Sequence, residues 1–421
     1  MSKKVSYHTL GCKLNYAETS AYARQLAAAG WEEVPAGPDV DLFVVNTCSV
    51  TEHADKKGRN LIRRLHKLAP GARIAVTGCY AQLKPQEILG IEGVDLVAGA
   101  GGKNGLVRQL IDGGNGAYGY SCDVDDIEAT FPAWSSGERT RSFLKVQDGC
   151  DYHCTYCTVP LARGRSRNIP IAEIVEQARE IAAKGIVEVV LTGVNTGDFG
   201  KTSGESFLGL LQALDAVPGI ERYRISSIEP NLLTGDILRW IASGTKFLPH
   251  FHIPLQAGCD RTLKAMHRRY TAGMFEDKIA LVREVLETPE ERGTRVFFGI
   301  DVIVGFPGES DEDFEETYAL LERVHPAFLH IFPYSRRAGT PAATMPGQVQ
   351  ESVKTARAER LQALSDRLHA EFTAANSGRK AKVLFESKLK GGKMFGYTEN
   401  YLRVERPFDK SIIGKIVEVN I

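Results

Sequence analysis

The sequence predicts an α/β protein with three parts: an N-terminal parallel sheet domain, a central incomplete (β/α)6 barrel and a small C-terminal β-barrel. Three observations predict this fold class. Short apolar runs alternate with helical patterns in the first hundred residues, and the same alternation resumes near residue 142. After residue 376, short strand-like runs separated by glycines take over. Alternating strands and helices are typical of a parallel sheet covered by helices.

Composition is that of an ordinary globular protein. A chain of 421 residues can form two or three domains, which we place at 1–115, 138–374 and 375–421, with a linker at 116–137. Lys+Arg and Asp+Glu are both 52, so any surface for nucleic acid must be local. We find no signal-peptide pattern and no apolar run of membrane-spanning length. We therefore expect a cytoplasmic protein without a membrane partner.

In the first domain, three cysteines follow three different strands. The expected strands cover 5–10, 41–46, 73–77 and 94–98, and the main helices cover 15–29 and 51–68. Cys12, Cys48 and Cys79 each come one or two residues after a strand. Because the carboxyl ends of parallel strands face one edge, these thiols should lie close together. We expect them to hold a [4Fe–4S] cluster, with three unrelated buried cysteines as the alternative.

The second part repeats the strand–helix unit six times, which predicts a barrel with an open side. The expected strands cover 143–147, 188–194, 222–228, 250–256, 295–305 and 327–333. Catalytic groups of such barrels sit at the carboxyl ends of the strands. His252 and Gln256 alternate on one face of the fourth strand and should point into the barrel, unless His252 is a satisfied core residue.

Three more thiols lie within eight residues, directly after the first barrel strand: Cys150, Cys154 and Cys157. Thiolates so close together can hold one metal centre, either zinc or an iron–sulfur cluster. No Cys or His in the next few dozen residues supplies the fourth ligand of a structural zinc site. A three-thiolate [4Fe–4S] cluster with one open iron therefore fits better than a zinc knuckle or core cysteines. Cys122 and Cys259 are expected to take no part in either centre.

The spacing of this cysteine stretch, with Tyr156 before its third cysteine, resembles the signature of radical S-adenosylmethionine (SAM) enzymes. Residues 10–15, 45–51 and 77–80 look like the three cysteine motifs of the methylthiotransferase family, which joins such an N-terminal domain to a radical SAM barrel. The resemblance implies two [4Fe–4S] clusters and SAM as cofactors. The cluster on Cys150, Cys154 and Cys157 would reduce SAM to generate a radical, and the other cluster would deliver the sulfur.

The resemblance also implies contacts with SAM. Gly193 and Asn195 look like the loop that contacts the methionine amino group. Glu229 would accept hydrogen bonds from the ribose, with a turn residue as the alternative. Ile303 would pack against adenine or, alternatively, belong to the strand core. Just after the cysteine loop, Arg163 or Arg165 could pair with the methionine carboxylate or with a substrate phosphate.

Branches of the family modify isopentenyladenosine or threonylcarbamoyladenosine in tRNA, or an aspartate of a ribosomal protein. Lys13 and residues 54–57 are most similar to the threonylcarbamoyladenosine branch, whereas Gly58 departs from it. The resemblance thus implies methylthiolation of carbon 2 of N6-threonylcarbamoyladenosine at tRNA position 37. The implied partners are the tRNA anticodon stem-loop, SAM and a low-potential electron donor of the flavodoxin or ferredoxin type. The other two branches remain alternatives, as does a non-catalytic metal-bound RNA-binding protein.

Two stretches are candidates for contact with RNA. The helix expected at 51–68 has a basic side that could meet phosphates or simply face solvent. Residues 376–421 contain ten Lys and Arg against five Asp and Glu, a local charge of +5. Small basic β-barrels often hold RNA, and the family carries one, named TRAM, at this place. A structural cap on the barrel is the alternative.

Overall fold

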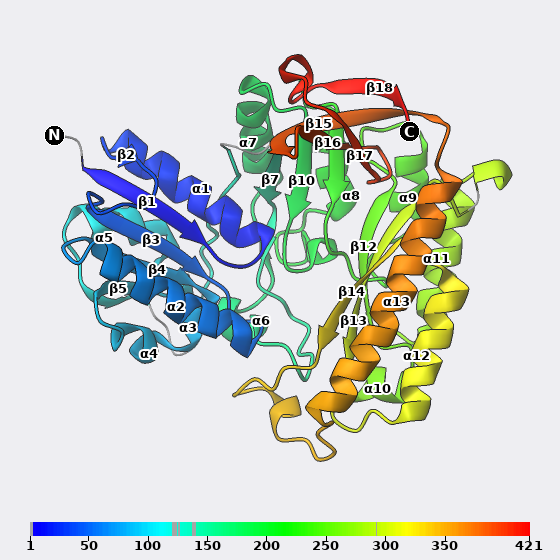
Figure 1. Cartoon of the computed structure of the whole chain (residues 1–421), viewed down its shortest axis with the longest axis horizontal. Helices are drawn as coiled ribbons and strands as arrows, with labels where there is room; N and C mark the ends of the chain where they lie inside the picture. Colours follow the sequence, from blue (N-terminus) through cyan, green and yellow to red (C-terminus); the bar gives the residue numbers. More distant parts are fainter. Residues whose placement is uncertain (1–2, 120–123, 125–126, 137–139, 292) are drawn as a thin grey trace.

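The N-terminal domain is a six-stranded parallel sheet with helices on both faces (Figure 1). The computed structural model describes all residues except 1–2, 120–123, 125–126, 137–139 and 292. In sheet order β2-β1-β3-β4-β5-β6, the strands are β2 (Glu32–Glu33), β1 (Lys4–Thr9), β3 (Leu42–Thr47), β4 (Arg73–Gly78), β5 (Val94–Ala98) and β6 (Gly116–Tyr118). The helices are α1 (Lys13–Ala28), α2 (Glu52–Leu68), α3 (Cys79–Leu83), α4 (Pro85–Leu89) and α5 (Leu106–Ile111).

Apolar strands explain why this sheet is covered on both sides. Every residue of β3 is buried, as expected for a central parallel strand. One face packs around Tyr22 of α1 and Leu106 of α5, and the other packs around Ile62 of α2. The hydroxyl of Thr51 accepts a hydrogen bond from Ala54 N at 3.2 Å and so caps α2 where the sequence predicts its start.

The central domain is an open barrel of six parallel strands, built from two three-stranded sheets in the orders β11-β10-β7 and β12-β13-β14. The strands are β7 (Arg141–Lys145), β10 (Glu188–Thr192), β11 (Arg222–Ile225), β12 (His250–Gln256), β13 (Phe297–Val304) and β14 (Phe328–Pro333). Bridges from Tyr223 to Phe247 and from Ser227 to His252 join the two sheets. The open side lies between β7 and β14, and α1 of the N-terminal domain packs against β7.

Helices surround the barrel. The long ones are α7 (Ile171–Ala183), α8 (Phe207–Asp215), α9 (Gly235–Ala242), α11 (Ala272–Leu286), α12 (Asp311–Val324) and α13 (Glu351–Ala375). The short elements are β8 (Gln147–Asp148), α6 (Val159–Arg163), β9 (Arg167–Asn168) and α10 (Asp260–Ala265). In the described part of the chain, no helix is long and apolar enough to span a membrane.

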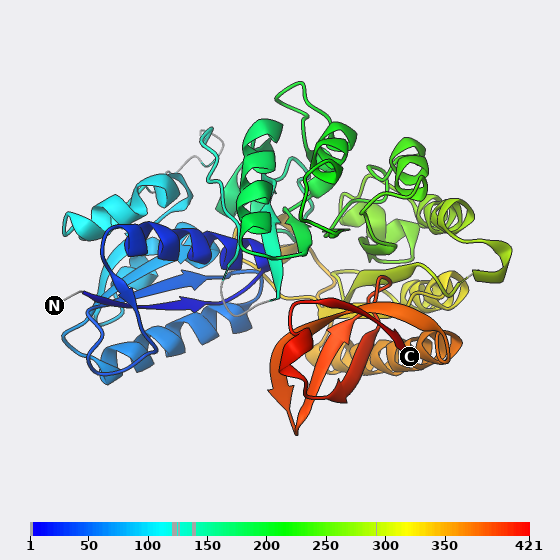
Figure 2. The ribbon, with the colours of Figure 1, turned by 90° about the horizontal axis from the view of Figure 1, so that it is seen from above.

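Residues after α13 form a curled antiparallel sheet that resembles half of a barrel (Figure 2). Its strands, in the order β17-β16-β15-β18, are β17 (Arg403–Pro407), β16 (Lys393–Tyr397), β15 (Lys380–Lys390) and β18 (Ile416–Asn420). Arg222 and Arg224 donate hydrogen bonds to the carbonyls of Lys382 (2.8 Å) and Thr398 (2.7 Å). The C-terminal sheet therefore docks at the amino ends of the barrel strands, opposite the cysteine loop.

The predicted fold class is confirmed. The strands that the sequence did not predict are short or lack an apolar pattern. β2 has two exposed glutamates and is held by backbone pairing with β1. β6 lies within the stretch expected as a linker and extends the N-terminal sheet. Later in that stretch, Phe131 and Trp134 are buried in the cores of the two large domains. Cys122 lies outside the described residues.

Candidate active site

The structure brings Cys12, Cys48 and Cys79 together at the carboxyl edge of the N-terminal sheet. They follow β1, β3 and β4, and the three thiols act on one another electrostatically. Cys48 and Cys79 are buried, whereas Cys12 is exposed. Burial raises the pKa of Cys48 to about 12. A buried thiol of this kind gives up its proton when a bound cation such as iron compensates the charge, so the donor set fits a cluster.

Two glycines allow the strand ends that carry these three cysteines to approach one another. Gly78 has a φ of +95°, and a Cβ there would lie 2.2 Å from the carbonyl oxygen of Thr47. Gly11 has a φ of +117°, and a Cβ there would lie 2.7 Å from the Cβ of Cys48. The strand ends can therefore approach closely only where no side chain intervenes.

We predict that Gly78→Ala lowers the iron content of the N-terminal site and destabilises the chain by more than the roughly 1–2 kcal/mol that a left-handed backbone costs alone. The added methyl must push Thr47, and with it Cys48, away from Cys79. Iron per chain and denaturant unfolding measure the two effects. Gly30→Ala is the matched control, because Gly30 has a φ of +85° but a Cβ there would have no other atom within 4 Å. Equal losses in both variants would contradict the packing argument.

Cys150, Cys154 and Cys157 form a second group after β8, and each sulfur accepts a hydrogen bond. The donors are Tyr152 N to Cys150 (3.4 Å), the Arg268 guanidinium to Cys154 (3.1 Å) and Val159 N to Cys157 (3.5 Å). Such donors stabilise sulfur that carries negative charge, as in cluster thiolates. Burial raises the pKa of Cys150 and of Cys157 to about 12, so these thiols also need a cation to ionise.

The loop after β10 is fixed beside the cysteine loop by one amide. Gln147 Oε1 accepts hydrogen bonds from Val194 N (2.9 Å) and Asn195 N (3.0 Å). A Cβ at Gly193 would lie 2.9 Å from the same oxygen, which explains the glycine. The side-chain oxygen of Asn195 is buried and has no hydrogen-bond partner in the described structure. It is therefore available to a donor such as the ammonium group of SAM.

Glu229 is buried and forms a short ion pair with Arg268. Burial raises the pKa of Glu229. Arg268 thus contacts both a cysteine of the loop and the acidic residue expected to bind ribose. The sequence showed Arg268 simply as one of several basic residues, and nothing in its pattern indicates burial. Ile303 lies with Tyr156 and Cys157 in a mainly apolar cavity of about 260 Å³, a suitable place for a nucleobase.

Arg163 lies at the interface between the first two domains, and its guanidinium bonds to the protein itself. It donates to Asp148 (2.9 Å), to Glu18 (3.2 Å) and to the side-chain oxygen of Asn15 (2.6 Å). Asn15 in turn donates to Thr47 O at 2.9 Å. The predicted contact with a SAM carboxylate or a phosphate is therefore replaced by a bridge from the cysteine loop to the N-terminal site.

Residues next to the two groups of thiols meet across this interface. Thr158, next to Cys157, donates a hydrogen bond to the carbonyl of Ser49, next to Cys48, at 3.5 Å. Arg337 donates to the hydroxyl of Ser49 (2.8 Å) and pairs with Asp55 of α2 (2.8 Å). The residues adjoining the two cysteine groups are therefore in direct contact.

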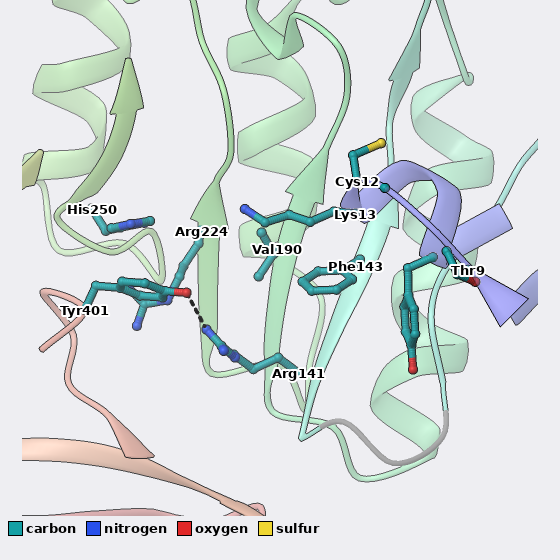
Figure 3. A pocket seen from close by; sticks show the side chains of 11 residues that line it. Thr9, Cys12, Lys13, Arg141, Phe143, Val190, Arg224, His250 and Tyr401 are labelled. Carbon is teal, nitrogen blue, oxygen red and sulfur yellow. Dashed lines mark hydrogen bonds between the residues drawn. The ribbon is translucent and has the colours of Figure 1, made fainter. Parts of the chain in front are cut away.

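A cavity of about 280 Å³ leads from the N-terminal cysteine edge into the barrel (Figure 3). Its lining comes from all three domains and includes Cys12, Lys13, Arg141, Phe143, Val190, Arg224, His250 and Tyr401. This volume is near the lower end of the roughly 300–1,000 Å³ typical of ligand pockets. Elsewhere in the barrel, His252 Nε2 lies 2.6 Å from Asp301 Oδ1, so the ring of His252 is hydrogen-bonded and partly buried.

The open six-stranded barrel, with three hydrogen-bonded thiols after its first strand, defines a radical SAM enzyme. Residues 144–321 match the family model of the Radical SAM superfamily, and residues 4–99 match that of Uncharacterized protein family UPF0004. The chain is 40% identical to the threonylcarbamoyladenosine tRNA methylthiotransferase MtaB of Bacillus subtilis, over 99% of this chain and 93% of that one. The chain belongs to the radical SAM methylthiotransferase family. It is therefore a transferase that uses SAM and iron–sulfur clusters.

Further similarities agree with this family. The chain is 36% identical to MtaB of Aquifex aeolicus over 99% of this chain and 100% of that one. It is 35% identical to the tRNA-2-methylthio-N(6)-dimethylallyladenosine synthase of Maricaulis maris over 100% of this chain and 94% of that one. The radical SAM methyltransferase TsrM of Kitasatospora setae superposes with a TM-score of 0.59 at 15% identity, covering 82% of this chain and 77% of that one. That last similarity concerns the fold alone.

Proposed function

We propose that this enzyme adds a methylthio group to carbon 2 of N6-threonylcarbamoyladenosine at position 37 of tRNA. The observation that carries the proposal is the contact between Thr158 and Ser49, which joins the residues next to Cys157 and Cys48. Joining sulfur to an unactivated carbon requires a hydrogen-abstracting centre and a sulfur source near the same atom. The substrate follows from relatives 34–40% identical over nearly the whole chain that are named for threonylcarbamoyladenosine.

Each thiol group holds one [4Fe–4S] cluster in this proposal. Cys150, Cys154 and Cys157 hold the cluster that binds SAM, and the other three cysteines, Cys12, Cys48 and Cys79, hold the second cluster. When bound, the first cluster would reduce SAM to generate the radical that removes hydrogen, and the second cluster would supply the sulfur that replaces it. The protein contributes the N–H donors that stabilise the thiolates and the barrel walls that exclude water.

Contacts with SAM are assigned to four residues. Asn195 accepts a hydrogen bond from the methionine ammonium, and Gly193 leaves room for that close approach. Glu229 accepts hydrogen bonds from the ribose, while Ile303 packs against adenine. Arg163 acts as a positioning residue, because its guanidinium holds Asn15 beside the N-terminal cysteines.

The tRNA anticodon stem-loop is expected to bind across basic surface on two domains. α2 exposes Lys56, Lys57, Arg63, Arg64 and Lys67 on the side away from its buried Leu61 and Ile62. The C-terminal sheet exposes most of its lysines as well. Such cations neutralise phosphates, and the target base must leave its stack to reach the barrel. A low-potential flavodoxin or ferredoxin and a cytoplasmic location complete the proposal.

Mass spectrometry of tRNA nucleosides tests the proposal directly. Anaerobically reconstituted enzyme is incubated with bulk tRNA, SAM and a reductant, and the nucleosides are then analysed. A methylthio product on threonylcarbamoyladenosine is the expected result. The same product on isopentenyladenosine would keep the reaction and change the substrate. No tRNA product despite intact clusters and cleaved SAM would point to a protein substrate instead.

A further inference from the structure

The cavity beside Cys12 contains a lysine, Lys13, that forms no ion pair with a carboxylate of the described residues. Lys13 is the first residue of α1, and Figure 3 shows its side chain reaching from the N-terminal domain toward Arg224 and Tyr401. Within the described part of the chain, Lys13 forms no ion pair and no hydrogen bond through its amine. Lys13 is half-buried, and a partly desolvated cation without a counter-charge is costly, so a ligand that supplies the negative charge would be favoured.

The other two cations of the cavity are already paired. The ion pairs are Arg141 with Glu386 at 2.8 Å and Arg224 with Glu188 at 2.8 Å. Of the carboxylates, Asp301 acts on Lys13 from within the barrel, but it is hydrogen-bonded to His252 at 2.6 Å. Lys13 is thus the cation whose donors remain free for a ligand.

Tyr401 shows that the cavity favours negative charge. Burial alone would raise the pKa of this phenol, but the positive charges of Arg141, Lys13 and Arg224 outweigh burial and lower it. Its hydroxyl lies 3.4 Å from the Arg141 guanidinium. Phe143 and Val190 add apolar wall to the same cavity. This combination suits a flat base with a short acidic arm better than a neutral, purely apolar group.

We propose that Lys13 binds the carboxylate of the threonylcarbamoyl group, so that the base stays beside Cys12 while its acidic arm extends toward Arg141 and Tyr401. This inference rests on the proposed function, and it identifies the residue that selects the substrate. An isopentenyl group has no charge to offer. Such a group would leave Lys13 desolvated and unpaired, and a polar group left unpaired in this way is a strong source of discrimination.

Two synthetic anticodon stem-loops test this role. One carries threonylcarbamoyladenosine with its free carboxylate, and the other carries the methyl ester of the same nucleoside. The holoenzyme should prefer the acid by about 10- to 100-fold in kcat/KM, the usual range for one charged hydrogen bond. Lys13→Gln should reduce this preference to within about threefold, whereas Lys13→Arg should keep most of it. Lys264→Gln, at an exposed lysine of α10, is the matched control and should keep the full preference.

The ratio of the two substrates is taken within each variant, so a partial loss of fold or cluster cancels. A wild-type enzyme that uses the ester as well as the acid would overturn the inference without any variant. The inference would also be overturned if Lys13→Gln lowered kcat/KM for both substrates by the same factor. A lysine bound to the SAM carboxylate or to an RNA phosphate would behave that way. If the wild-type enzyme methylthiolates neither RNA, the proposed function itself fails, and the inference fails with it.

Discussion

Cys154→Ala is expected to abolish the cleavage of SAM. Cys154 lies between the other two cysteines of its loop, and its sulfur accepts a hydrogen bond from Arg268 at 3.1 Å. With two thiolates left, a cluster held by this loop would lack one of its protein ligands, and the cleavage of SAM that depends on it would stop. Losing a ligand should cost more than the roughly 10- to 100-fold that loss of a ligand's hydrogen-bond partner costs. Chromatography of 5′-deoxyadenosine after reduction with dithionite measures the effect.

The partner experiment uses the other thiol group. Cys48→Ala should keep part of the SAM cleavage and lose methylthio transfer, because Cys48 belongs to the N-terminal site and lies outside the barrel. Cys259→Ala is a suitable control, since this buried thiol is hydrogen-bonded to Asp313 at 3.0 Å, away from both groups. Methylthiolation at the wild-type rate by the Cys48 variant would refute the assignment of two separate sites.

Much of this fold can be predicted because the strands are apolar and regularly spaced. The barrel strand at 250–256 is predicted with both ends correct, as a short apolar run in which His252 and Gln256 share one face and are partly exposed while the other residues are buried. The register of Cys12, Cys48 and Cys79 after three parallel strands likewise follows from topology alone. The sequence does not reveal β16, which pairs with β15 in a hairpin. Met394 is the fully buried apolar side chain of this strand, and one such residue is too weak a pattern to detect.

Charged contacts of the site could not be predicted in the same way. Arg163 and Arg268 sit among other arginines in the sequence, and periodicity does not distinguish a buried guanidinium from an exposed one. Their partners are distant along the chain: Glu18 reaches Arg163 through the packing of two domains, and Glu229 reaches Arg268 through the folding of the barrel itself. Lys13 shows the same limit, because its lack of a partner is a property of the folded cavity.

The second large effect is expected at Glu18, which ties the N-terminal domain to the barrel. Its Oε1 accepts from three buried cations: Lys103 (2.8 Å), Lys145 (2.8 Å) and Arg163 (3.2 Å). Asp148 is the other carboxylate that pairs with these three cations. Glu18→Ala therefore leaves three cations to one carboxylate. Breaking a buried ion pair on one side costs about 3–5 kcal/mol, and we expect a loss of that size in the free energy of unfolding.

Denaturant unfolding of the cluster-free chain, followed by circular dichroism, measures this loss. Glu176→Ala is the control, because Glu176 is exposed and pairs with Arg179 at 2.9 Å on the surface. Such a pair is worth at most about 1 kcal/mol. The double variant Glu18→Ala with Lys103→Met should recover part of the stability, because it removes one of the cations that lose Glu18 as a partner. A Glu18 variant no less stable than the Glu176 variant would show that these buried ion pairs do not hold the two domains together.

Acid should reveal the same contribution. Burial alone would raise the pKa of Glu18, but Lys103, Lys145 and Arg163 outweigh burial and hold the pKa well below its ordinary value of 4.5. The carboxylate is therefore ionised in the folded chain at pH values where the unfolded chain already binds a proton. Its contribution is complete above the unfolded pKa and is lost progressively as the pH falls below about 4.5. Stability of the wild-type chain should fall more steeply than that of Glu18→Ala between about pH 5 and pH 3, and parallel curves would contradict the role of this carboxylate.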